Sequence, residues 1–118
     1  MESILTSIKK LLGITEEDKN FDTDVIIHIN SVFMTLNQLG VGPEEGYMIT
    51  DEMATWNNFL GDEAKAKTIL AVKTYTYLNV KMLFDPPASS SALAAMQRES
   101  DKLEWRICQQ IELNKEEV

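Results

Sequence analysis

The chain of 118 residues has one cysteine and one histidine, and this scarcity excludes several kinds of site. Cys108 alone cannot form an intrachain disulfide, and a reducing compartment is its natural setting. A structural zinc site needs about four ligands, which Cys108 and His28 together cannot supply. A nucleophilic pair of the two is disfavoured, because both lie on or near apolar stripes and a buried thiol is normally inert. His28 is better explained as a histidine at the border of a helix face than as an acid–base catalyst.

Phosphate-binding and calcium-binding patterns are also missing. Gly40, Gly42 and Gly46 have the spacing G-x-G-x-x-x-G and follow an expected helix, so they fail the dinucleotide fingerprint in both spacing and context. The acidic runs at 16–18 and 44–45 lack the ligand alternation of a calcium loop. We therefore expect no metal, no cofactor and no enzymatic activity.

Basic residues are few, with 11 against 19 acidic ones and a net charge of −8. This balance argues against broad binding to a phosphate backbone or to an anionic membrane surface. No window approaches the ~18 uninterrupted apolar residues that span a bilayer. Residues 1–13 are amphipathic with lysines in the middle, whereas a signal peptide places its charge first. We expect the protein to stay in the compartment where it is made.

Hydrophobic residues make up 44% of the chain, which is enough for one core in a domain of this size. We expect residues 1–118 to form a single domain. Apolar residues recur at helical spacing, and no convincing strand ladder is present. The pattern predicts an all-α fold, a compact bundle of four to five helices with a long central helix and a Gly-rich loop between helices two and three. The expected helices cover residues 3–12, 22–39, 51–60, 62–84 and 90–115.

Several boundaries are marked by capping and breaking residues. Asp22 is a good N-cap for the second helix. Residues 40–50 hold three glycines and a proline, so they must form a loop, with a short extended piece expected at 47–49. Thr50 or Asp51 is expected to cap the short third helix.

The fourth expected helix, 62–84, is apolar around most of its circumference. Only Lys67, Thr74 and Lys81, at seven-residue steps, form a polar strip, and residues 85–87 (Asp-Pro-Pro) end the helix. Such a helix is usually buried, so it is either the central helix or one that also meets another subunit. For the lysines, pairing with carboxylates is favoured over contact with nucleic acid.

Three features suggest a protein partner. Ile27 and Met34 stand one heptad apart, off the main stripe of the second helix. Trp105 lies off the apolar stripe of the last helix, and tryptophan is a common hot-spot residue of interfaces. Single exposed apolar residues are ordinary. Ordinary exposure is the favoured explanation for Ile27 and Met34 taken alone. For Trp105, ordinary exposure and a place in an interface are equally supported. Taken together, the three features favour self-assembly or docking on a partner.

The order of segments is itself distinctive. ILTSIKKLLGI opens the chain, an acidic connector leads to FDTDVIIHINSVFMTLNQLGVG, and AVKTYTYLNVKMLFDPP precedes a charged terminal helix. From about residue 5 to residue 111 the chain resembles the head–tail connector (head-completion or adaptor) family of tailed bacteriophages and prophages. Many members have small residues in the middle of the second helix, where this chain has Asn30 and Ser31, so packing there is expected to differ.

The resemblance implies a helical structural protein without a catalytic motif. Such proteins form a ring beneath the portal vertex after DNA packaging, dodecameric if it follows portal symmetry, and offer the surface for tail or stopper proteins. DNA would only pass through the channel, which acidic charge would keep from sticking. The expected location is the bacterial host cytoplasm during assembly and then the head–tail interface of the virion, with no membrane contact.

A ring of identical subunits needs two different faces on each copy. The expected interface residues come from the second helix, the Gly-rich loop, the long helix and the last helix. They are Ile27, Met34, Tyr47, Lys67, Lys81 and Trp105. The loop at 40–50 is also a candidate for the segment that orders on docking, because fixing a glycine-rich loop costs entropy.

A second hypothesis comes from a different class of protein. A small acidic regulator without catalytic activity would bind one host protein, with carboxylates imitating the charge of DNA. The acidic residues are scattered over loops and helix starts rather than ordered along one face, which weakens this hypothesis.

Overall fold

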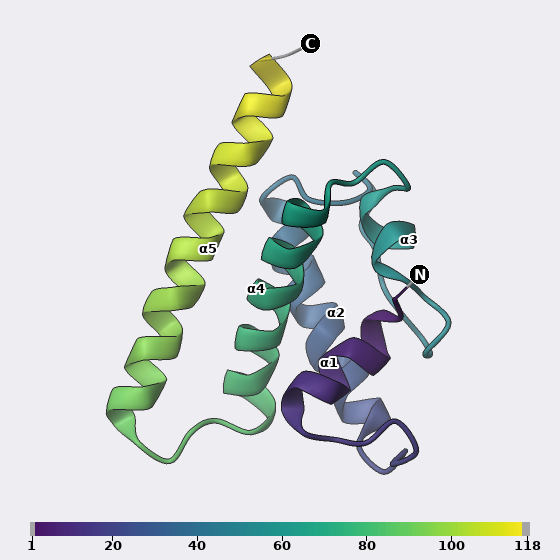
Figure 1. The fold of residues 1–118 in the computed structure, drawn as a ribbon, viewed down its shortest axis with the longest axis vertical. Helices are drawn as coiled ribbons and strands as arrows, with labels where there is room; N and C mark the ends of the chain where they lie inside the picture. The colour runs from purple at the N-terminus through teal and green to yellow at the C-terminus, as the bar shows by residue number, and fades with distance from the viewer. Residues whose placement is uncertain (1, 117–118) are drawn as a thin grey trace.

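The computed structural model describes residues 2–116, with 114–116 described by their backbone only. This part of the chain folds into five helices without a strand, which confirms the predicted all-α bundle (Figure 1). They are α1 (Ile4–Leu12), α2 (Asp22–Gln38), α3 (Trp56–Leu60), α4 (Ala66–Phe84) and α5 (Ser90–Glu116). Among the described helices, none combines the length and apolar character that crossing a membrane requires.

Helix α4 is the central helix, as its nearly continuous apolar circumference predicted. It packs against α1, α2 and α5 (Figure 1). Val72 and Val80 are fully buried, and so is the polar Thr76, whose hydroxyl donates to the carbonyl of Val72 at 2.8 Å. A buried hydroxyl that donates within its own helix avoids the cost of an unmatched polar group. Leu70 and Leu83 nevertheless remain exposed on α4.

An aromatic cluster joins α2 to α3 and the loop before it. The rings of Phe33 and Phe59 stack with centroids 4.2 Å apart, and Tyr47 stacks on Phe59 at 5.2 Å. Trp56 is 1% exposed, and its indole Nε1 donates to the hydroxyl of Ser7 in α1 at 2.9 Å. The short α3 therefore belongs to the same core as α1 and α2, because Trp56 and Phe59 are both buried and Trp56 is also hydrogen-bonded to α1.

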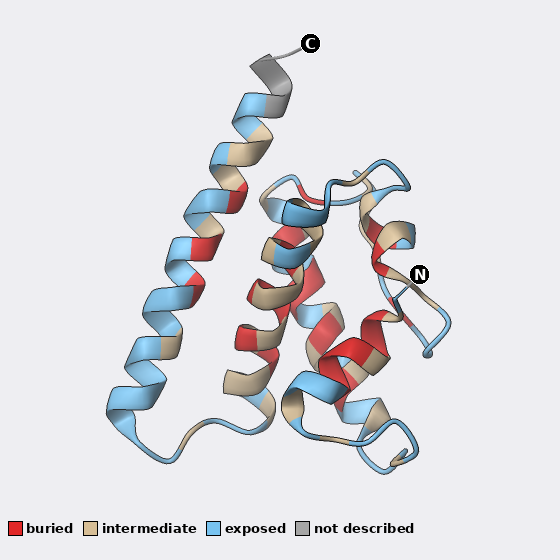
Figure 2. Ribbon diagram, viewed as in Figure 1, coloured by how far each residue is buried: buried red, intermediate tan, exposed pale blue. Residues whose placement is uncertain are grey.

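Helix α5 has 27 residues and packs on the bundle along one side only. Leu103 and Ile107 are buried against the rest of the molecule, while most of the first ten residues of the helix are exposed. Figure 2 shows buried positions confined to the side of α5 that faces α4. A long helix packed in this way leaves a large outer face to solvent.

Two helices begin later than the sequence predicted. α3 starts at Trp56 rather than near Thr50 or Asp51, because Thr55 caps it in a reciprocal capping box with Asn58. Asp51 instead accepts a hydrogen bond from the backbone of Met53 at 2.8 Å, which closes a local turn.

Helix α4 starts at Ala66 rather than Asp62. Gly61 has a φ of 96°, and the N–H of Ala64 donates to its carbonyl at 3.2 Å. This turn occupies the residues that were expected to form the first helical turn. Residues 47–49, which were expected to be extended, lie outside any helix and pair with no strand; in residues 2–116 the one β-bridge joins Ser3 to Thr55.

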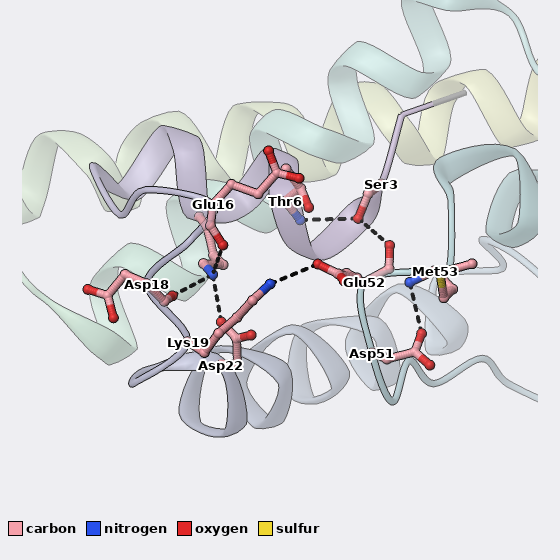
Figure 3. A network of polar contacts seen from close by, with 10 residues as sticks. Ser3, Thr6, Glu16, Asp18, Lys19, Asp22, Asp51, Glu52 and Met53 are labelled. Carbon is pink, nitrogen blue, oxygen red and sulfur yellow. Dashed lines mark hydrogen bonds and ion pairs between the residues drawn. The ribbon is translucent and has the colours of Figure 1, made fainter.

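Lys9 is a buried cation that joins α1 to the connector and to α2, and Figure 3 labels its partners Glu16, Asp18 and Asp22. Its side chain is 3% exposed, and its ammonium contacts a carboxylate oxygen of Asp22 at 2.7 Å. It also donates to the backbone carbonyls of Glu16 at 3.2 Å and Asp18 at 2.6 Å. Asp22 is therefore the first helical residue of α2 and an ion-pair partner, while Phe21 occupies the N-cap position that was expected for Asp22.

Gly42 allows the loop after α2 to cross the aromatic cluster. Its φ is 82°, and a Cβ atom built on it would overlap the ring of Phe59. We expect Gly42→Ala to destabilise the fold by about 2 kcal/mol or more, because left-handed strain and a steric clash add. Gly46→Ala is the matched control: its φ is 96° and its Cβ would meet nothing within 4 Å. Urea unfolding midpoints check this, and equal losses for the two variants would contradict the proposed clash.

Candidate interaction surfaces

The α2 strip, defined as Ile27 and Met34, faces solvent. Their exposed fractions are 56% and 67%, so these residues lie outside the core, as their position off the main stripe predicted. Ser31 lies between them and is also exposed, with its hydroxyl donating to the carbonyl of Ile27 at 3.1 Å. The α2 strip is thus an exposed apolar line without a covering segment in the described part of the chain.

A shallow groove of about 270 Å³ adjoins this strip where α2, α4 and α5 meet. Its walls combine apolar and amide side chains, and Asn79 donates to the hydroxyl of Ser100 at 2.9 Å across α4 and α5. The lining residues are Ser31, Val32, Thr35, Tyr75, Asn79, Met82, Leu83 and Gln97. No described residue in this groove is a histidine, a cysteine or a carboxylic acid, so it offers a surface for packing rather than groups for acid–base chemistry.

Burial raises the pKa of the Tyr75 phenol to about 12, and the nearby charges of Glu104 and Asp101 add to the effect. The folded protein therefore favours the neutral phenol more than the unfolded chain does, since the pKa of an unperturbed tyrosine is 10.0. The resulting stabilisation is present below pH 10 and is lost as the pH rises through about 12. We expect an absorbance titration to show a late-ionising phenol that Tyr75→Phe removes. A late phase that persists in this variant would contradict the assignment.

The loop after α2 is held against that helix in the isolated chain. Asn30 donates to the carbonyl of Ile49 at 3.0 Å and accepts from its N–H at 2.8 Å. Two turns along α2, Asn37 donates to the carbonyl of Pro43 at 3.0 Å. Tyr47 packs inward on the aromatic cluster and is half-buried, and burial raises its pKa. The exposed apolar side chain of this loop is its neighbour Met48, at 69%.

Trp105 is 65% exposed on the outer face of α5, whereas Trp56, the other tryptophan, is buried. Its helical neighbours Arg98, Lys102 and Gln109 are also exposed. A tryptophan in this position exposes a large apolar area that a partner would cover. Trp105 and the α2 strip lie on different helices and form two separate surfaces.

The two lysines of the polar strip on α4, Lys67 and Lys81, lie in different surroundings. Lys81 forms an ion pair with Asp85 at 2.7 Å, and Lys73 pairs with Glu2. Lys67 is exposed and lines a cleft of about 370 Å³ between the loop after α2, the start of α4 and the upper part of α5. The preference for carboxylate partners thus holds for Lys81, while Lys67 belongs to a separate cleft together with Arg106.

Sequence reasoning missed two groups of exposed residues. Arg98, Lys102 and Arg106 recur at four-residue steps and form a basic ridge along α5, a spacing that the sequence already carries. Met48 and Met53 are 69% and 76% exposed in the segment before α3. Their exposure depends on how that segment lies on α2, which no local pattern indicates.

The residues suited to catalysis or metal binding do not form a site. His28 is half-buried at the edge of α2, with its ring 6.2 Å from that of Phe84. Cys108 is half-buried on α5. Within the described residues, no group of three or more histidine, cysteine, aspartate or glutamate side chains is arranged to hold a metal ion. The exposed surfaces described above are the candidate functional features.

The family model for phage connector proteins matches residues 4–114. The chain belongs to this family, whose members are structural proteins of the phage head–tail junction. The match covers the extent over which the sequence resembles head–tail connectors. No curated protein and no solved structure matches the chain.

Proposed function

We propose that residues 1–118 form one connector domain that docks as a ring beneath the portal vertex after DNA packaging and provides the surface for tail or stopper attachment. The ring has twelve copies if it follows portal symmetry. The protein acts without catalysis and without a cofactor, and DNA only passes through the channel. It is soluble in the host cytoplasm during assembly and then resides at the head–tail interface.

Membership in the phage connector family is the observation that carries this proposal. The exposed faces add physical support, because a ring of identical subunits joins one face of each copy to a different face of the next. Three exposed surfaces support the proposal, because they offer apolar area for contacts between copies and with portal and tail proteins: the α2 strip, the outer face of α5 and the methionines before α3. The net charge of −8 supports a channel that repels DNA.

In vitro complementation tests the proposal. Phage heads assembled without this gene product are expected to be filled with DNA and to lack tails. Adding the purified chain should restore tail joining, because the chain supplies the missing attachment surface. The Trp105→Glu chain should fail to restore tail joining although its core is unchanged, because it is expected to fold without assembling. Normal tailed, infectious particles formed without the gene product would refute the proposed role.

A further inference from the structure

The outer face of α5 carries a line of three cations in an acidic protein. Residues 1–64 hold twelve acidic and three basic residues, whereas residues 65–118 hold seven acidic and eight basic ones. Arg98, Lys102 and Arg106 form the ridge on α5, and Trp105 stands beside it, three residues from Lys102. These four residues are called the basic face, and all of them are exposed.

Among the described side chains, no carboxylate forms an ion pair with the three cations of the basic face. Each of the ion pairs among the described side chains involves another lysine: Lys9, Lys19, Lys73 or Lys81. Unpaired cations next to an exposed tryptophan are available for an acidic partner with an apolar centre. The basic face extends into the cleft between α4 and α5, which Arg106 and Lys67 both line.

A complementary surface lies on the same chain. Residues 43–53, called the acidic loop, carry four exposed carboxylates around the two exposed methionines, Met48 and Met53. The carboxylates belong to Glu44, Glu45, Asp51 and Glu52, of which Glu52 already forms an ion pair with Lys19 at 3.0 Å. Figure 1 places α5 at one edge of the molecule and the segment that leads into α3 at the opposite edge, whereas the loop begins next to Gly42, which lines the same cleft as Arg106. No ion pair among the described side chains joins the two surfaces within one subunit, so both are available to a neighbouring copy.

We propose that the occupant of the basic face is the acidic loop of a second copy of this chain, in a head-to-tail contact that repeats around the ring. This inference rests on the proposed function and specifies which faces meet. Methionine side chains pack on Trp105, since a thioether contacts an aromatic ring favourably, and the surrounding charges set orientation and register. The contact is heterologous, so each copy uses both surfaces and the chain of contacts can close.

DNA is the competing occupant of a basic ridge, and the composition of α5 disfavours it. Asp101, Glu104 and Glu112 lie on the same helix, and the subunit as a whole is strongly acidic. Phosphates approaching the ridge would meet the exposed Asp101 and Glu112, which weakens the counterion release that drives binding to DNA. An acidic loop of a few charges with an apolar centre fits the ridge better than a continuous phosphate backbone does.

Charge reversal with rescue tests the contact. Variant A carries Arg98→Glu, Lys102→Glu and Arg106→Glu, and variant B carries Glu44→Lys and Glu45→Lys. Each alone is expected to weaken self-association at least about 100-fold, because like charges meet at every contact. An equimolar mixture of A and B should assemble again as an alternating ring, since each reversed surface then meets its complement. Sedimentation equilibrium at low salt measures these effects.

Glu16→Lys with Glu17→Lys is the matched control for variant B, because it makes the same change in net charge at exposed positions outside the acidic loop. It should associate like the wild type. The inference is overturned if the wild type stays monomeric, if A and B associate normally, or if their mixture is not rescued. If A instead loses retention on DNA while self-association is unchanged, DNA occupies the face. Complementation of tail joining by the wild type is read separately, so the proposed function can stand if this inference fails.

Discussion

Trp105→Glu is expected to block assembly while leaving the subunit folded. The indole is 65% exposed on α5, so its removal should change the free energy of unfolding by no more than about 0.5 kcal/mol. If the same indole is buried at a contact between copies, its loss should cost about 2 kcal/mol or more of association free energy. The new carboxylate adds the cost of desolvating a charge. Sedimentation velocity measures assembly, and circular dichroism checks the fold.

Met34→Glu tests the α2 strip in the same way, because Met34 is 67% exposed on α2. Leu11→Glu is the control: Leu11 is a large apolar residue of α1, 47% exposed, that is not a candidate interface residue. It should assemble like the wild type. If Trp105→Glu and Met34→Glu also assemble normally, neither residue belongs to the interface.

Lys9→Met is expected to lower the free energy of unfolding by about 3–5 kcal/mol, the largest effect of any single replacement of a charged residue proposed for this protein. Methionine keeps the volume of the side chain but removes the charge that pairs with Asp22 and the donors to the carbonyls of Glu16 and Asp18. Asp22 is then left as a largely buried carboxylate without a cation, and two carbonyls lose their donor.

Lys10→Met is the matched control, because Lys10 is adjacent in sequence, has the same side chain and is exposed. It should change stability by no more than about 0.5 kcal/mol. Urea unfolding of the two variants gives the comparison directly. Equal stabilities would mean that the Lys9 ion pair contributes nothing net to the fold.

Helical periodicity was sufficient to predict most of the architecture. The predicted bounds of the first, second and last helices differ from those of α1, α2 and α5 by one residue at most, because each has an amphipathic pattern and clear end signals. The starts of α3 and α4 were misplaced. Several Thr and Asp residues compete as caps there, and the choice depends on the side chain of Asn58 and the backbone of Gly61.

The sequence did not predict which of two residues of the same type is buried and which is exposed. Lys9 and Lys10 are adjacent lysines on an amphipathic helix, yet Lys9 is buried because the following connector folds back over it. The side chains of Asn30 and Asn37 hold the loop after α2 through hydrogen bonds to backbone carbonyls 19 and 6 residues further along the chain. No local pattern in the sequence distinguishes an asparagine that anchors a loop from one that faces solvent.

The candidate surfaces were partly predictable. Positions off the apolar stripe correctly indicated that Ile27, Met34 and Trp105 are exposed, because helix geometry alone fixes the direction of such side chains. Tyr47 was expected to be available to a partner but packs on Phe59, since the loop direction is set by contacts with α2 and α3. That these residues form interfaces remains a prediction, which the variants above test.

The central claim is that this connector assembles with copies of itself at the portal. Light scattering of the purified chain, over a wide concentration range and with and without a portal assembly, tests it most directly. We predict a closed species whose protein mass is an integral multiple of the 13.4 kDa subunit, formed by the chain alone or on the portal. A strict monomer under both conditions, with no mass added to the portal, would contradict the claim.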